Sequence, residues 1–293
     1  MRRGLVLGAL VAAGVATIAG AGLGAQPAQQ PQPLAIEQVK GNLYMITGGG
    51  GNVGVYIAAN GVVLVDSKLA NYGQQILDRV KSVTDKPVTH IINTHTHGDH
   101  VGSNEFFPAS VDIVAHEATA AYMARMPAFQ DAAKKHGLPD RTFSDRLTVL
   151  SGTDSIDLYY FGPSHTGGDA FVVFRGLATM HAGDAFPGPT VPIMDVNNGG
   201  SGLAYADTLA KAAAGVKGVT TVIPGHSGVT TWQAFVDYGE FVKSFVSSIQ
   251  AAHRAGKTAE QAAAEFTPAE KFAGFNLQRA RADAEVIFKE LQR

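Results

Sequence analysis

Residues 93–100 read NTHTHGDH, which places three histidines and one aspartate within six positions. A short apolar run ends where this stretch begins, so the chain is expected to be extended there. His95 and His97 then point to the same side, because side chains alternate along an extended chain. Asp99 and His100 follow a glycine that permits a turn, so the second pair is directed away from the first. The two pairs predict two neighbouring metal ions, and the alternative is a polar loop with solvated histidines.

Three more residues with metal-binding side chains each follow an apolar run and lie next to glycine or proline. His165 occurs in GPSHTGGD, Asp184 in HAGDAF and His226 in PGHS. Ligands in α/β proteins gather where strands end, so these side chains are expected to converge on the first cluster. Each of the three is a weak signal alone. Together they predict a metal centre assembled from the ends of several strands.

The composition excludes several other classes of protein. The chain has 293 residues, 45% of them hydrophobic, which is enough for one large domain or two small ones. The net charge is −2 and no run of Lys or Arg occurs beyond the first residues, so nucleic acid is not an expected partner. There is no cysteine, which excludes disulfides, a thiolate ligand and a cysteine nucleophile.

The N-terminal sequence predicts export. Residues 1–25 begin with two arginines, continue as a Leu, Val and Ala stretch and end in small residues, as a signal peptide does. The polar segment 26–34 is expected to be a linker. We therefore expect a periplasmic protein with no stable membrane association after cleavage. The alternative is an uncleaved membrane anchor, because the apolar stretch is long.

The order of apolar runs predicts an α/β fold. Strands are expected at 36–48, 52–67, 88–93, 111–115, 146–151, 155–162, 169–176, 177–184 and 220–225. Helices are expected at 71–83, 116–126, 203–216, 232–256, 258–266 and 277–291. These elements predict one domain over 35–230 and a C-terminal helical extension, 231–293, packed on it. Two β-rich halves flanked by helices would form layers of helix, sheet, sheet and helix.

The ordered set of histidines and aspartates resembles the metallo-β-lactamase superfamily of metal-dependent hydrolases. The similar residues are the H-x-H-x-D-H motif at 95–100, then His165, Asp184 and His226. The resemblance covers roughly residues 36–228 and includes Asp66 in VVLVDS. It implies a four-layered αββα sandwich with the metals at one edge of the two sheets.

The resemblance also implies how the ligands divide. The first metal would be held by His95, His97 and His165. The second would be held by Asp99, His100 and His226. Asp184 would bridge the two metals.

The donor types suit two zinc ions, and they also tolerate iron or manganese. Two such ions can share a hydroxide, which would attack a substrate carbonyl. Asp99 is expected to orient the attacking water and to carry its proton as a catalytic residue. Asp66 is expected to accept a hydrogen bond that fixes a ligand imidazole, without itself binding a metal. The alternative for Asp66 is a turn residue at a strand end.

The expected function is hydrolysis of an ester, lactone, thioester or amide in a small-molecule substrate. One large class of β-lactamases in the superfamily has a cysteine where this chain has Asp184, and the AFPGPTVP stretch beside it offers no cation for a substrate carboxylate. A genuine β-lactamase remains an alternative. So do a mono-iron, sulfur-oxidising oxidoreductase of the same fold and a non-catalytic metal-binding protein. The oligomeric state is left open.

Two segments could border the site. Residues 126–143 are either a flap over it or a surface excursion. The glycine-rich segment 195–202 either forms the rim of the pocket or serves only as a tight turn.

Overall fold

The computed structural model describes residues 33–292 and contains two β-sheets. The first sheet has seven strands in chain order, from β1 to β7. Its strands are β1 (Ala35–Lys40), β2 (Leu43–Thr47), β3 (Val53–Ala58), β4 (Gly61–Val65), β5 (Val88–Asn93), β6 (Asp112–His116) and β7 (Arg141–Phe143). Strands β1 to β4 are antiparallel neighbours, whereas β4 to β7 are parallel.

The second sheet has six strands in the order β13-β12-β11-β10-β9-β8. They are β8 (Arg146–Val149), β9 (Ile156–Tyr159), β10 (Phe171–Phe174), β11 (Thr179–His181), β12 (Thr221–Ile223) and β13 (Thr230–Thr231). Only the β11–β12 pair is parallel among these described strands. The sequence pattern did not predict β7 and β13, because strands of three and two residues are too short to show periodicity.

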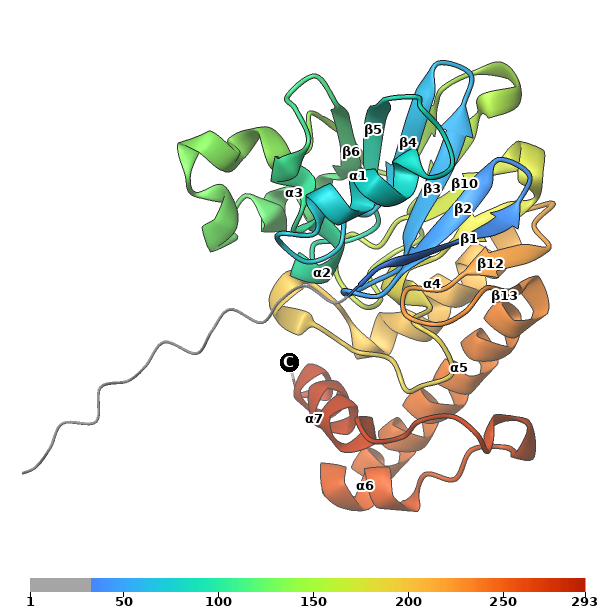
Figure 1. The fold of residues 1–293 in the computed structure, drawn as a ribbon. Helices are drawn as coiled ribbons and strands as arrows, with labels where there is room; N and C mark the ends of the chain where they lie inside the picture. Colours follow the sequence, from blue (N-terminus) through green and yellow to red (C-terminus); the bar gives the residue numbers. More distant parts are fainter. Residues whose placement is uncertain (1–32, 293) are drawn as a thin grey trace, which may run out of the picture. The chain divides into compact units, whose positions relative to one another are not determined.

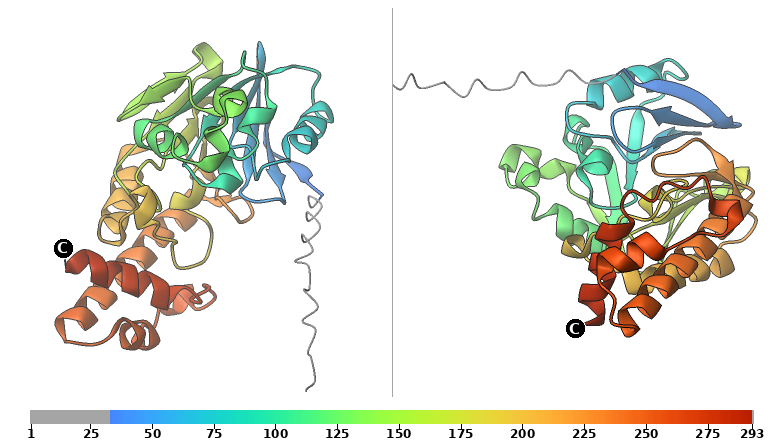
Figure 2. Two further views of the ribbon diagram at one scale, coloured as in Figure 1. Left: turned by 90° about the vertical axis from the view of Figure 1, so that its left-hand side faces the viewer. Right: turned by 90° about the horizontal axis from the view of Figure 1, so that it is seen from below.

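Helices cover the outer face of each sheet (Figure 1). The α-helices of the described residues are α1 (Gly73–Lys81), α2 (Gly98–Val101), α3 (Glu117–Met123), α4 (Gly202–Gly215), α5 (Trp232–Arg254), α6 (Ala259–Glu265) and α7 (Ala280–Leu291). Helix α1 packs on the first sheet, and α4 and α5 pack on the second, whereas α6 and α7 pack on α4 and α5 (Figure 2). The layers are therefore helix, sheet, sheet and helix, as the sequence predicted.

Strand β4 shows how the layers form. All five of its residues are buried. Val62 and Leu64 pack with α1 on one side, whereas Val63 and Val65 pack between the two sheets on the other. This alternation follows from the two-residue period of a strand, and a strand buried on both faces has a continuous apolar sequence.

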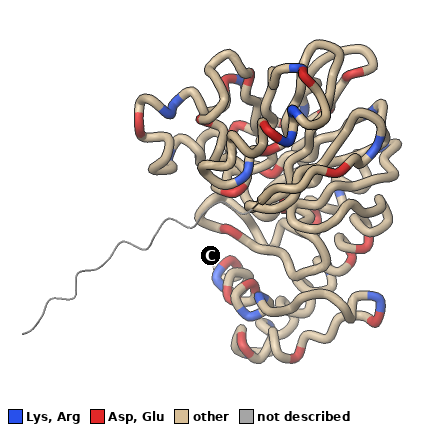
Figure 3. The backbone as a smooth tube through the Cα atoms, in the orientation of Figure 1, with Lys and Arg blue, Asp and Glu red and all other residues tan. Residues whose placement is uncertain are grey.

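The predicted export signal, residues 1–25, and most of the predicted linker, 26–34, lie outside the described residues. Within residues 33–292, no helix is both long and apolar enough to cross a membrane. Lys and Arg residues are interspersed with Asp and Glu residues over this part of the chain (Figure 3).

The segment 126–143 folds into two short 3-10 turns and then pairs as β7 with the edge of the first sheet. Its Phe129 and Phe143 are buried. Asn104 also donates a hydrogen bond to the Gly137 carbonyl at 3.0 Å. These contacts attach the segment to the edge of the first sheet, to helices α2 and α3 and to the turn that follows α2.

Candidate metal centre

The first group of ligand atoms comes from both sheets. His95 and His97 follow β5, His165 follows β9, and Asp184 lies in the turn after β11. One ring nitrogen or carboxylate oxygen of each lies within 4.8 Å of the corresponding atom of every other. His165 Nε2 is 2.8 Å from His97 Nδ1, and Asp184 Oδ2 is 3.6 Å from His165 Nε2. The fold thus brings together residues that are up to 89 positions apart in sequence.

The second group comprises Asp99, His100 and His226, whose ligand atoms also lie within 4.8 Å of one another. Asp99 and His100 are in the short helix α2, and His226 follows β12. Asp184 lies between the two groups: its Oδ2 is 3.1 Å from His226 Nε2, and its Oδ1 is 3.3 Å from His100 Nε2. All seven predicted ligands therefore lie together, in the division that the resemblance implied.

In each of these buried imidazoles, the ring nitrogen that faces away from the centre has a hydrogen-bond partner of its own. His165 Nδ1 donates to the Ile193 carbonyl at 2.7 Å. His95 Nδ1 lies 3.0 Å from the Thr94 hydroxyl, which itself donates to Asp66. These contacts fix the tautomer and leave the inward nitrogen as a lone pair that can bind a metal.

Carboxylates hold the outward ring nitrogens of His97 and His100. His97 Nε2 donates to Asp195 Oδ2 at 2.7 Å, and His100 Nδ1 donates to Asp66 Oδ2 at 2.7 Å. The inward nitrogens of His97 and His165 therefore face each other as lone pairs at 2.8 Å, a repulsive arrangement that a bound cation would relieve.

The donor set fits divalent metal ions. His95 Nε2 and Asp184 Oδ1 are buried and have no hydrogen bond, which is costly unless another partner is present. Burial lowers the pKa of His95 well below its usual value, and it also lowers the pKa of His165. Both imidazoles are therefore neutral at pH 7, the form that binds metal. Nitrogen donors combined with carboxylates are typical of zinc sites.

Charges at the centre of the cluster are coupled. Burial alone would lower the pKa of His100, but the carboxylates of Asp184 and Asp66 outweigh it and raise this pKa well above the usual value. Burial alone would raise the pKa of Asp184, but His100 and His226 hold it well below the usual value. Asp184 is therefore an anion, the form in which a carboxylate binds a metal ion.

Two glycines allow the backbone to approach the ligands closely. A Cβ added to Gly51 would lie 2.1 Å from His100 Cε1, and one added to Gly225 would lie 1.9 Å from Asp184 Oδ1. Any side chain at these positions would displace a ligand. The glycines next to the predicted ligands therefore have a steric role at the site.

Asp66 lies where the sequence predicted, at the end of β4. Its Oδ1 accepts from the Thr94 N–H at 2.7 Å, and its Oδ2 accepts from the Thr94 hydroxyl as well as from His100. Its φ is 69°, in the left-handed region that is uncommon for residues other than glycine. A turn residue would not need to be fully buried among ligands, so this geometry favours the imidazole-fixing role.

Three residues that no sequence pattern indicated hold the site together. Asp195 was predicted to lie either in the rim of the pocket or in a tight turn, yet its carboxylate accepts a hydrogen bond from His97. Lys68 is fully buried and donates to the carbonyls of Ile46 at 2.9 Å and Gly51 at 2.6 Å, and burial lowers its pKa to about 7. The Asn52 side chain donates to carbonyls on both sides of His226. No local motif marks these residues, because their partners are distant in sequence.

The comparison with protein families agrees with this geometry. Residues 46–226 match the model of the metallo-beta-lactamase superfamily, and the chain belongs to this superfamily. The resemblance drawn from the histidine and aspartate pattern is therefore confirmed.

Curated relatives are similar over part of their lengths. The chain is 32% identical over 178 residues to the alpha subunit of 2,4-dinitroanisole O-demethylase from Nocardioides sp. (strain JS1661), which covers 58% of this chain and 52% of that protein. It is 30% identical over 136 residues to the uncharacterized protein YobT of Bacillus subtilis (strain 168), covering 43% and 58%. It is 29% identical over 159 residues to a type 2 metallo-beta-lactamase of Elizabethkingia meningoseptica, covering 50% and 59%. The chain thus spans between half and three fifths of the length of these relatives.

Solved structures share the fold. DIM-1 metallo-beta-lactamase aligns with a TM-score of 0.61 and 16% identity over 73% of this chain and 98% of that one. A metallo-beta-lactamase from Pontibacter korlensis aligns with a TM-score of 0.60 and 17% identity over 72% and 99%. At these identities the likeness concerns the fold alone, and it confirms the predicted αββα architecture.

Proposed function

We propose that this chain is a hydrolase that binds two zinc ions and cleaves an ester, lactone, thioester or amide bond in a small molecule. The observation that carries this proposal is the presence of two ligand groups that share Asp184. The second group contains all three residues that the resemblance assigns to a second metal, which favours two metals over the mono-iron alternative. Iron or manganese could occupy the same donors, so the metal is part of the test.

The residues of the chain have distinct roles in this proposal. When bound, the two ions would supply an acidified water and a Lewis acid for the substrate carbonyl. The Asp99 side chain is 27% exposed, and its Oδ2 lies 3.4 Å from His226 Nε2. Asp99 is therefore accessible to hold and transfer a proton at the reacting centre. Asp66 and Asp195 keep the ligand imidazoles oriented, so the centre needs little rearrangement.

The cleft beside His226 favours substrates without a carboxylate. It is lined by residues 187–190, Ile193, Ser227 and Asn276, and none of these described residues is Lys or Arg. A β-lactamase needs a donor for the carboxylate of its substrate. The Nocardioides relative is named for O-demethylation of 2,4-dinitroanisole, which is not a lactam. The Elizabethkingia relative is named as a lactamase, and β-lactam hydrolysis is therefore kept as a second candidate.

A metal analysis with a substrate panel tests the proposal. The zinc-loaded full chain is expected to hold about two zinc ions, as in two-metal hydrolases. It should hydrolyse at least one of an aryl ester, a lactone and a thioester, with loss of activity in a chelator and recovery on adding zinc. Fastest turnover of nitrocefin would favour the second candidate. One iron per chain with oxygen uptake would overturn the hydrolase assignment.

Variants of the site provide the second part of the test. Asp99→Asn and His165→Ala are expected to lower kcat/KM on the best substrate by at least ~100-fold, while circular dichroism shows a folded protein. His253→Ala is a matched control, because His253 contacts Phe288 and belongs to neither ligand group. Full activity in both site variants would show that the centre is wrongly assigned.

We also propose that residues 1–25 direct export to the periplasm. The N-terminal pattern of two arginines, an apolar stretch and small residues supports this. Cell fractionation should recover the protein with the periplasm, and mass spectrometry should find a mature N-terminus near residue 26. A full-length protein in the membrane fraction would instead indicate an uncleaved anchor.

A further inference from the structure

Two adjoining cavities extend away from the second ligand group. The first has a volume of about 360 Å³ and is lined by His226, Ser227, Pro189 and Asn276 among others. The second has a volume of about 390 Å³, and Pro189 and Ser227 line it too. The two cavities therefore meet at Pro189 and Ser227. Cavities of this size are typical of small-molecule sites.

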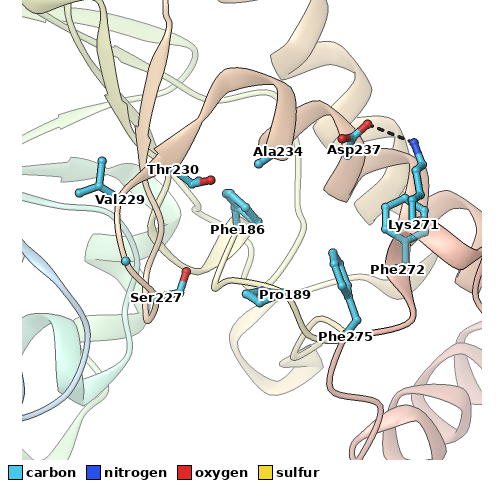
Figure 4. Close-up of a pocket in the computed structure, with 11 residues that line it drawn as sticks. Phe186, Pro189, Ser227, Val229, Thr230, Ala234, Asp237, Lys271, Phe272 and Phe275 are labelled. Carbon is cyan, nitrogen blue, oxygen red and sulfur yellow. Dashed lines mark hydrogen bonds and ion pairs between the residues drawn. The ribbon is translucent and has the colours of Figure 1, made fainter.

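The walls of the second cavity are mostly apolar. Phe186, Phe272 and Phe275 face the cavity, with Val229 and Ala234 on other sides (Figure 4). Phe186 lies two residues after Asp184, and Phe272 and Phe275 come from the C-terminal extension. Aromatic walls bind apolar groups by excluding water from a large area.

The cation in this wall is already compensated. Lys271 Nζ lies 3.1 Å from Asp237 Oδ1 and 2.6 Å from Glu240 Oε2 (Figure 4 shows the contact with Asp237). Its ammonium group is thus neutralised by two carboxylates. An anionic group entering the cavity would find no unpaired cation among the described lining residues.

Backbone hydrogen bonds hold the C-terminal wall in place. The Asn276 N–H donates to the Pro189 carbonyl at 3.0 Å, and the Asn276 carbonyl accepts from the Val191 N–H at 3.0 Å and from the Thr190 hydroxyl at 3.0 Å. This connection joins the segment after Phe275 directly to the loop that borders the first cavity. The wall is consequently preformed, which reduces the entropy lost on binding.

We propose that the second cavity binds the apolar acyl chain of an uncharged substrate whose carbonyl lies at the ligand groups. This inference rests on the proposed hydrolase function and specifies its substrate class. The C-terminal extension would then determine specificity through Phe272 and Phe275, while the two sheets supply the chemistry.

A series of p-nitrophenyl esters tests this proposal on the zinc-loaded full chain. We expect kcat/KM to rise about twofold to fourfold for each added methylene from acetate to octanoate, because each methylene enters an apolar wall. A succinate monoester, which carries a negative charge, should react at least tenfold more slowly than butyrate. A series that stays flat while acetate is hydrolysed would overturn the pocket and leave the hydrolase function intact.

Variants locate the effect in the cavity. Phe272→Ala and Phe275→Ala should lower the octanoate-to-acetate ratio of kcat/KM at least fivefold. Ala234→Phe, which fills the cavity without removing a core side chain, should do the same. Phe288→Ala is the matched control: it deletes the same atoms from a partly buried phenylalanine that does not line the cavity. An equal loss in the control and the cavity variants would overturn the assignment.

A binding measurement separates this inference from the function on which it rests. The uncharged fluorescent probe N-phenyl-1-naphthylamine should bind the full chain, and Ala234→Phe should weaken this binding at least fivefold while Phe288→Ala does not. This result without hydrolysis of any ester, lactone, thioester or amide substrate would support the apolar site and overturn the hydrolase proposal. Equal probe binding by the wild type and Ala234→Phe would overturn the site.

Discussion

Asp283 on α7 is a buried carboxyl group far along the chain from any predicted ligand. It is 1% exposed, and its Oδ2 has no hydrogen bond. Burial raises its pKa to about 7, although Arg279 and the Met194 N–H act in the opposite direction. In the unfolded chain the pKa of an aspartate is about 3.9. Between these two values the folded protein binds more protons than the unfolded chain, so stability is lost as the pH rises from ~4 to ~7.

Replacing this carboxyl by an amide should remove that loss. We expect Asp283→Asn to raise the free energy of unfolding at pH 8 by about 2–4 kcal/mol, because one pKa unit is worth ~1.4 kcal/mol. Below pH 4 the difference from the wild type should nearly vanish. Urea unfolding of both proteins across this pH range measures it. Glu285→Gln, an exposed site on the same helix, is the control. An asparagine variant that is less stable at pH 8 would contradict the expectation.

The aspartates around the imidazoles show what a residue-level pattern can predict. Asp66 was predictable because it ends an apolar strand in a recognisable motif. Asp195 performs the same task for His97 but lies 98 positions away, in a segment whose glycines suggested only a rim or a turn. The type of a side chain is local information, whereas its partner depends on how distant loops meet.

At the scale of elements, one contact fastens the last helix to the body. The Glu290 carboxylate on α7 accepts from the N–H groups of Gly202 at 3.2 Å and Leu203 at 3.0 Å, and from the Ser201 hydroxyl at 3.2 Å. These N–H groups begin α4 and have no partner within that helix. The negative charge also interacts favourably with the positive end of the helix dipole.

Glu290→Ala should therefore destabilise the protein by about 1–2 kcal/mol, and Glu290→Gln by less, since an amide keeps one acceptor. Glu285→Ala, which removes only an exposed pair with Arg281, should change stability by less than ~0.5 kcal/mol. Thermal unfolding of the three variants makes the comparison. Equal losses of stability in Glu290→Ala and Glu285→Ala would mean that the contact between Glu290 and α4 does not stabilise the protein.

The long elements were predictable from their own residues. The run VTHIIN coincides with β5, because its β-branched residues Val, Thr and Ile favour an extended chain. The short elements were not: α2 has four residues and β13 two, and their formation depends on neighbours. Helix α2 begins at Gly98, inside the histidine motif, and its short turn separates Asp99 and His100 from the earlier pair.

At the scale of the whole molecule, the ligands join the two sheets. His95 and His97 follow a strand of the first sheet, whereas His165, Asp184 and His226 follow strands of the second. Bound ions would therefore connect the two sheets at one edge. An ion that binds the folded chain but not the unfolded one stabilises the whole domain by mass action.

Removal of metal should consequently lower the melting temperature. At a free zinc concentration ~1,000-fold above Kd the stabilisation is about 4 kcal/mol, which corresponds to roughly 10 °C for a domain of this size. Calorimetry of the chelator-treated chain with and without zinc measures the shift. Magnesium, which prefers oxygen ligands, is the control and should have little effect. A melting temperature that does not change when zinc is added would contradict a metal centre that spans the two sheets.

The sequence by itself determined the side-chain types of the seven candidate ligands, the spacing within residues 93–100, and the apolar runs that become the strands of two sheets. These features depend on side-chain chemistry and on periods of a few residues, which a local stretch contains in full. Only the tertiary structure decided that Asp195 fixes His97, that Lys68 is buried beside the site, and that the segment at Phe272 and Phe275 lines a cavity next to the ligand groups. Those contacts join positions far apart in sequence, and they form only when the two sheets and the C-terminal helices pack together.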